Sequence, residues 1–109
     1  MDLNIDSSLN KRRDPFQAIA DPTRRLMIEL LAVQSRSIND LAQHFKISRP
    51  AVSKHVKILE ECGMIIIKKK GRERQCRIDY RVLKSVANWV MKFELYWEEH
   101  LIRLDHSKP

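Results

Sequence analysis

The sequence has little of several residue types, and each shortage excludes a class of protein. It has two cysteines, Cys62 and Cys76, in 109 residues, which is too few for a disulfide framework, and neither belongs to a CxxC motif. No apolar run approaches the roughly 20 residues that a membrane-spanning helix needs, and the N-terminus lacks the apolar stretch of a signal peptide. We therefore expect a cytoplasmic protein without a membrane span.

Glycine is equally scarce, and Gly63 and Gly71 are the only two. No glycine-rich phosphate loop, nucleophile–base pair or carboxylate constellation is recognisable, so we expect neither an enzyme nor a cofactor. The length allows one domain. We predict a flexible basic arm at 1–13, one folded domain at 14–105, and a tail at 106–109.

Positive charge is plentiful. The formal net charge is +7 and the isoelectric point is about 9.7, so a polyanion is the natural partner, either a nucleic acid or an anionic membrane surface. Residues 49–77 hold nine Lys and Arg residues against three Glu residues, which concentrates the excess in one region. Such clustering exceeds what solubility requires.

Capping residues and apolar spacing predict four helices before Gly63. Their N-caps are Asp14, Asp21, Ser37 and Ser48, and the helices run from Pro15 to the Asp21-Pro22 pair, from Pro22 to about Val33, over 38–45, and from 49 to 61 or 62. Gly63 suits the left-handed conformation that ends a helix. The second helix is expected to bury Leu26, Met27, Leu30, Leu31 and Val33.

After Gly63 the pattern becomes extended. Met64–Ile67 and Gln75–Ile78 flank a run of basic residues around Gly71, which predicts a two-stranded hairpin with a basic tip. One long helix follows, from Asp79 or Tyr80 to Leu104. Its apolar residues lie close to a coiled-coil seam that one small domain cannot cover, so we expect a dimer. The seam comprises Leu83, Val86, Val90, Phe93, Trp97, Leu101 and Leu104.

The order of helices, helix-turn-helix, basic hairpin and long helix predicts a mainly α, winged helix-turn-helix fold with five helices. The major groove of DNA, about 12 Å wide, accepts one helix that is apolar inside and basic outside, as Ser48–Lys57 is. Arg49 and Lys54 could reach base edges, whereas Ser48, Ser53 and Lys57 suit phosphates. The hairpin would form a wing beside the duplex, with Lys68, Lys69, Lys70, Arg72 and Arg74. Alternatively, these charges form an ordinary solvated face or protect a strand edge.

Three segments together resemble ArsR-type (ArsR/SmtB) winged-helix repressors: Ala20–Leu26, Ser48–Leu59 and Gly71–Arg74. The resemblance covers about residues 14–105 and implies a homodimer that represses transcription by blocking a promoter on double-stranded operator DNA. It also implies that the first and last helices form the dimer interface, for which we select Phe16, Ile19, Val86, Val90, Phe93, Trp97 and Leu101. By position, the resemblance places DNA contacts on Ser48, Arg49, Pro50, Ser53, Lys54 and Lys57, with the wing at Lys70, Arg72 and Arg74.

The sequence departs from this family at both of its usual metal sites. The family's thiolate site is a cysteine pair where this chain has Ser37–Ala42, and its other site needs Asp-x-His where this chain has Asp79-Tyr80-Arg81. We expect no bound metal. The aromatic segment Phe93–Trp97 is similar to the metal-independent, SdpR-like branch, whose members include autorepressors.

Two other functions stay open. The chain could be a protein-interaction module whose apolar last helix binds a protein or membrane partner, or the basic face could bind RNA, although no aromatic residues are interleaved with its basic ones. Whether an inducer or partner protein acts on it is also open. Cys62 and Cys76 are interpreted as small buried residues, and His55 as either a phosphate contact or a packing residue.

Overall fold

A computed structural model describes residues 13–107. The predicted arm therefore lies outside the described residues except for Arg13, and so do the last two residues of the predicted tail. The helices are α1 (Pro15–Ala18), α2 (Pro22–Val33), α3 (Ile38–Ala42), α4 (Arg49–Glu61), α5 (Tyr80–Met91) and α6 (Glu94–Ser107). The strands are β1 (Arg36–Ser37), β2 (Ile65–Lys70) and β3 (Glu73–Ile78). This order confirms the mainly helical, winged helix-turn-helix fold.

The predicted N-caps all cap helices. Asp14 accepts hydrogen bonds from the N–H groups of Phe16 and Gln17, and Asp21 accepts one from Arg24. Ser37 and Ser48 each accept from the backbone N–H three residues ahead. These contacts are local, so the residue types and their spacing were sufficient to predict them.

The helices α1 to α5 and the sheet enclose one core. Its fully buried side chains come from α2, α3, α4, the start of the hairpin and β3: Met27, Leu31, Leu41, Val52, Val56, Leu59, Met64 and Cys76. Two α2 residues that were expected to be buried are exposed: Leu26 is 53% exposed and Val33 is 77% exposed. Ile28 is buried instead, so the inner face of α2 is rotated from the predicted one.

The sheet has a third strand that the sequence pattern did not predict. β1 pairs antiparallel with β3, with Arg36 opposite Cys76 and Ser37 opposite Gln75, and the strand order is β1-β3-β2. A strand of two residues shows no alternation, so only its pairing reveals it. The β1 strand, which directly precedes α3, is thereby paired with the middle of β3.

Two helix predictions need correction. The third helix was expected to reach Phe45 but ends at Ala42, after which the N–H groups of His44 and Phe45 donate turn hydrogen bonds to the carbonyls of Leu41 and Ala42. The predicted long last helix is two helices, α5 and α6, because the N–H groups of Lys92 and Phe93 bond to carbonyls three residues back and tighten the helix there. The last helix also extends further than expected, to Ser107 and not to Leu104.

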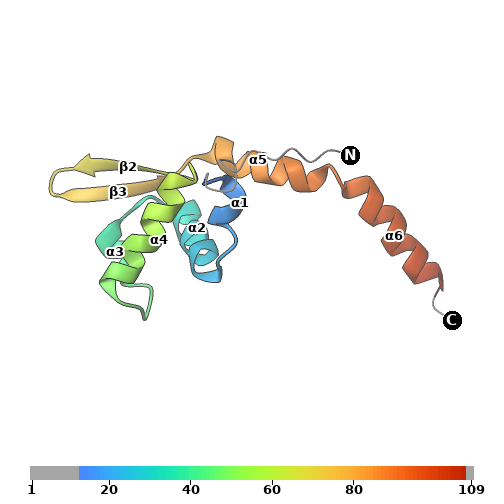
Figure 1. Cartoon of the computed structure of the whole chain (residues 1–109), viewed down its shortest axis with the longest axis horizontal. Helices are drawn as coiled ribbons and strands as arrows, with labels where there is room; N and C mark the ends of the chain where they lie inside the picture. The colour runs from blue at the N-terminus through green and yellow to red at the C-terminus, as the bar shows by residue number, and fades with distance from the viewer. Residues whose placement is uncertain (1–12, 108–109) are drawn as a thin grey trace, which may run out of the picture.

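The last two helices give the molecule its elongated shape. Figure 1 shows α5 leaving the body beside α1 and α6 projecting from it at an angle. The radius of gyration is 18.1 Å, compared with about 13 Å for a compact chain of this length. The α6 helix therefore finds little cover within its own chain, and the apolar residues of α5 and α6 form much of the exposed apolar surface.

Candidate nucleic-acid interface

The α4 helix has one buried and one exposed face. Val52, Val56 and Leu59 are buried against the core, which fixes the helix beside α3. Pro50 lies in the first turn, where a missing N–H costs no helical hydrogen bond. All six residues that the sequence assigned to DNA on this helix are exposed: Ser48, Arg49, Pro50, Ser53, Lys54 and Lys57.

Arg49 is held in place by two hydrogen bonds. Its Nη2 donates to Oδ1 of Asn39 on α3 over 2.7 Å, and its Nη1 donates to Oγ of Ser53 over 3.1 Å. The guanidinium therefore bridges the two helices of the helix-turn-helix. The sequence pattern gives no sign of this role for Asn39, because a contact between residues on two helices leaves no signal in local spacing.

His55 faces the body of the protein. Its Nδ1 lies 3.4 Å from Nη1 of Arg24 and 3.9 Å from Oδ2 of Asp21. Arg24 also donates to the backbone carbonyls of Gln17 and Ala18. The pKa of Asp21 is lowered below its ordinary value, mainly by the hydrogen bond from the Arg24 backbone N–H. The charges of His55 and Arg24 lower it further, whereas burial acts in the opposite direction. Of the two interpretations of His55, the packing role matches this geometry.

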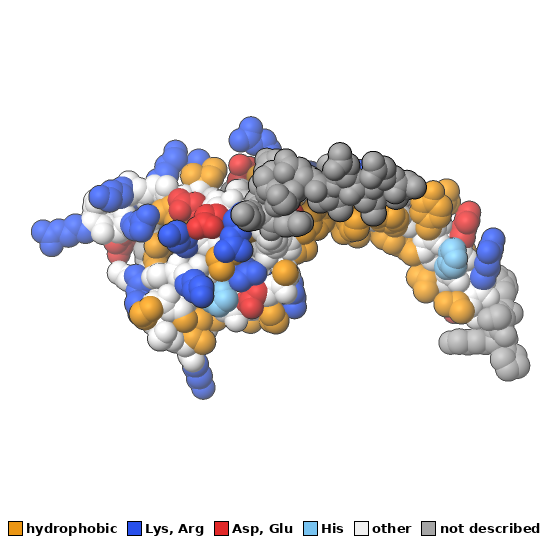
Figure 2. Space-filling view, viewed as in Figure 1, with side chains coloured by type: hydrophobic (Ala, Val, Ile, Leu, Met, Phe, Trp, Pro, Cys, Tyr) orange, Lys and Arg blue, Asp and Glu red, His pale blue; other side chains and the backbone are white. Residues whose placement is uncertain are grey.

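The hairpin forms a basic wing. β2 and β3 pair from Ile65–Ile78 to Lys70–Glu73, and Gly71 turns the chain with a φ of 66°, a value that glycine adopts without strain. Lys68, Lys69, Lys70, Arg72 and Arg74 are exposed. Figure 2 shows Lys and Arg side chains around the hairpin and the helices below it, while hydrophobic side chains follow α5 and α6.

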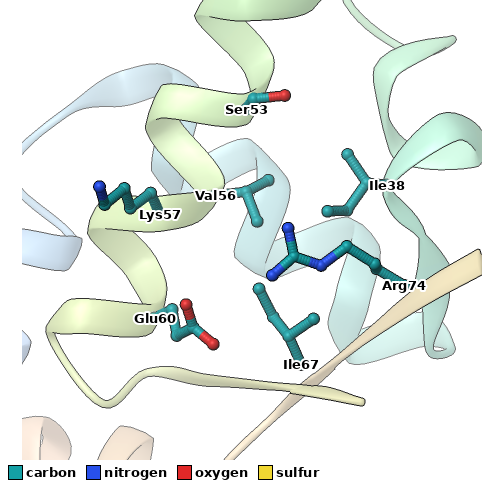
Figure 3. A pocket seen from close by; sticks show the side chains of 7 residues that line it. All are labelled: Ile38, Ser53, Val56, Lys57, Glu60, Ile67 and Arg74. Atoms are coloured by element: carbon teal, nitrogen blue, oxygen red, sulfur yellow. The ribbon is translucent and has the colours of Figure 1, made fainter. Parts of the chain in front are cut away.

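The wing and α4 border a common hollow. It has a volume of about 350 Å³ and is lined by Ile38, Ser53, Val56, Lys57, Glu60, Ile67 and Arg74. Figure 3 shows the guanidinium of Arg74 reaching from β3 toward α4, while Lys57 points away from the hollow. A second, adjoining hollow is lined by Asn39 and Arg49 together with Arg72 and Arg74. The fold thus brings the start of α4 and the wing to one region of the surface.

Neither cysteine lines these two hollows. Cys62 and Cys76 are free and buried. Burial raises the pKa of both thiols, that of Cys76 to about 11, so neither forms a reactive thiolate near neutral pH. Within residues 13–107 no group of three His, Cys, Asp or Glu side chains has an arrangement that could hold a metal ion. None of the described helices combines the length and apolarity that crossing a bilayer requires.

Known proteins share both the sequence pattern and the fold. The family model described as "Bacterial regulatory protein, arsR family" matches residues 21–66. Over 78 residues the chain is 37% identical to the transcriptional repressor SdpR of Bacillus subtilis, covering 72% of this chain and 87% of SdpR. It is 38% identical over 78 residues to the HTH-type transcriptional regulator Rv2034 of Mycobacterium tuberculosis, covering 72% and 73%.

A solved structure supports the same relationship. The crystal structure of an ArsR-family transcriptional regulator is 36% identical and superposes with a TM-score of 0.70, covering 77% of this chain and 92% of that one. A second crystal structure, of a possible transcriptional regulator for arsenical resistance, is 34% identical with a TM-score of 0.70 and covers 88% and 97%. With its capped helix-turn-helix and basic wing, this chain belongs to the ArsR family of winged helix-turn-helix transcriptional regulators.

Proposed function

We propose that this protein is a homodimeric repressor that binds double-stranded operator DNA through α4 and the wing and so blocks a promoter. The observation that carries the proposal is the exposed face of α4, whose basic residues adjoin the arginines of the wing at one surface. Helices with this polarity fit the major groove, and a neighbouring basic hairpin can contact phosphates. The similarity to SdpR, itself named a transcriptional repressor, supports repression.

We also propose that the protein acts in the cytoplasm, where bacterial DNA lies, and without its family's two usual metal switches. Serine, isoleucine, asparagine and aspartate occupy 37–40, where the thiolate site of the family would supply cysteine. Arg81 stands where the other site needs histidine, and its Nε lies 3.5 Å from Oδ1 of Asp79. A guanidinium in that position is a poor metal ligand because it stays protonated.

The second copy would cover the apolar face of α1, α5 and α6. The rings of Phe16 and Trp89 meet at 5.3 Å, and those of Trp89 and Phe93 meet at 5.0 Å, yet all three side chains are 39% to 49% exposed. Val90 and Leu101 extend this surface, and Ile19 and Trp97 are partly covered. Val86 lies within the protomer's own core, being 7% exposed, so it would support the interface from beneath.

Charge favours a second copy as the occupant of this face. The α6 helix carries four acidic residues, Glu94, Glu98, Glu99 and Asp105, against one arginine. The α5 helix and the residue that follows it carry Arg81, Lys84 and Lys92 and no acidic residue. If α6 of one protomer packs beside α5 of another, opposite charges surround the apolar contact, and this arrangement specifies orientation.

Binding measured against salt concentration tests the proposal. The probe is the duplex region upstream of the protein's own gene, titrated in gel shifts at several salt concentrations. A dimer contacting about 8 phosphates should give a slope near −7 for log affinity against log salt, because each neutralised phosphate releases counterions. A flat response would exclude DNA binding through the basic surface and favour the protein-interaction alternative.

A further inference from the structure

Asn39 lies outside both predicted DNA-contacting elements, but its side chain binds the arginine expected to read bases. Oδ1 of Asn39 accepts a hydrogen bond of 2.7 Å from Nη2 of Arg49. This distance is at the short end for an N–H donor, as is typical when the donor carries charge. Ser53 accepts from Nη1 on the other side. Two of the guanidinium's N–H groups thus point at neighbours within the protein.

The backbone that carries Asn39 is fixed by several contacts. β1 pairs with β3 immediately before it, and Ser37 caps α3 through the Asp40 N–H. Arg36 donates from Nε to the carbonyl of Leu30 and from Nη1 to the carboxylate of Asp40. On either side of Asn39 in the helix, Ile38 and Leu41 are buried in the core. The Asn39 side chain therefore projects from a rigid base, although it is itself exposed.

Among the residues that the structure describes, the Arg49 side chain is restrained only by its own hydrogen-bond partners, and not by packing in the core. It is the first residue of α4 and its side chain is exposed, so without partners its torsions would sample many rotamers. Asn39 and Ser53 restrict the plane of the guanidinium. Asn39 and Arg49 also line one hollow together with Arg72 and Arg74. The remaining N–H groups stay available to a ligand on the exposed side.

We propose that Asn39 is a positioning residue for DNA sequence discrimination, because it holds the Arg49 guanidinium in the orientation that meets a base edge. The proposal rests on the proposed operator binding. Asn39 contributes through preorganisation, since a guanidinium already oriented loses less rotamer freedom when it forms a bidentate contact. Its loss should reduce preference for the cognate sequence and leave the contacts with phosphates unchanged.

The test is a double-mutant cycle on Asn39 and Arg49. The probes are a duplex that the wild-type protein selects from a random-sequence library and a random duplex of equal length. Asn39→Ala should lower the ratio of cognate to random affinity by about tenfold, the lower end for one hydrogen bond to a charged group, with the salt slope unchanged. In an Arg49→Ala background the same change should have no further effect, because its partner is already gone.

Two further variants separate positioning from folding. Asn39→Asp keeps an oxygen acceptor at the same place, so it should retain the cognate-to-random ratio while its negative charge weakens binding to both duplexes equally. Gln43→Ala removes an exposed amide from the end of the same helix and should match the wild type. All variants should unfold at the wild-type temperature, because these side chains are exposed.

The outcomes distinguish the two proposals. If the wild-type protein selects no sequence from the library, the proposed function fails. If it does, the role of Asn39 is refuted when Asn39→Ala keeps the wild-type ratio, or when it lowers the ratio equally with and without Arg49. The role of Asn39 is also refuted if Asn39→Asp lowers the cognate-to-random ratio as much as Asn39→Ala does.

Discussion

Arg49 and Arg72 are both exposed arginines, yet their surroundings differ. Arg49 begins the helix that would enter the major groove and is held by Asn39 and Ser53. Arg72 follows Gly71 at the tip of the wing, in the turn that joins the paired strands. A fixed guanidinium on a groove helix suits base edges, whereas one at the tip of a hairpin suits the phosphate backbone.

This difference predicts unequal effects of two matched substitutions. Arg49→Ala should relax sequence preference, costing about 1 to 3 kcal/mol on the cognate duplex and less on random DNA. Arg72→Ala should weaken both duplexes similarly and reduce the salt slope by about 1 for each protomer. Gel shifts on the two probes at several salt concentrations measure both effects. Equal losses on cognate and random DNA for both variants would contradict the division of roles.

Among the elements, the turn between α4 and β2 sets the direction of the wing relative to the recognition helix. Gly63 ends α4 with a φ of 76°, and the N–H of Met64 returns to the carbonyl of Leu59. A Cβ added at Gly63 would find Val82 Cγ2 at 3.9 Å, an ordinary contact. Space is therefore available there, and the backbone conformation alone requires glycine.

Gly63→Ala should consequently destabilise the protein by about 1 kcal/mol or slightly more, through the left-handed conformation and not through a clash. Chemical denaturation monitored by circular dichroism measures the change. Gly63→Asn is the matched control, because asparagine tolerates this conformation better than alanine in spite of its larger side chain. A greater loss for asparagine than for alanine would indicate that volume, and not φ, decides this position.

At the scale of the whole molecule, the α6 helix carries apolar residues on two sides. Phe93, Trp97 and Leu101 follow one another at four-residue spacing and continue the aromatic contacts between α1 and α5. Leu95 is 65% exposed and lies about 120° around the helix from Leu101, which is itself 57% exposed. The proposed dimer uses the side that bears Phe93, Trp97 and Leu101.

Leu101→Glu should therefore convert the dimer to monomers and weaken operator binding, because a charge would be buried at the interface. Sedimentation equilibrium measures the association, and circular dichroism checks that the protomer is folded. Leu95→Glu places the same charge on the other side of the same helix and should leave the dimer intact. Dissociation by Leu95→Glu but not by Leu101→Glu would place the interface on the side that bears Leu95.

Local features of the chain were sufficient to predict most of its elements, and only long-range contacts decided the rest. Caps at Asp14, Asp21, Ser37 and Ser48 act within three residues, and Gly63 and Gly71 act through their own φ angles, so residue type and spacing determine them. The exposed basic face of α4 likewise follows from helical periodicity.

The tertiary structure decided the pairing of β1 with β3, the bond from Arg49 to Asn39 and the inward position of His55. It also divided the last helix at Lys92 and Phe93, where no proline or glycine marks a break and where the Phe93 ring packs against Trp89. Each of these features depends on a contact that local spacing does not encode, whether a backbone pairing, a side-chain hydrogen bond or a contact between rings. Periodicity records which face of a helix is apolar, but it does not record which residue of another element that face will meet.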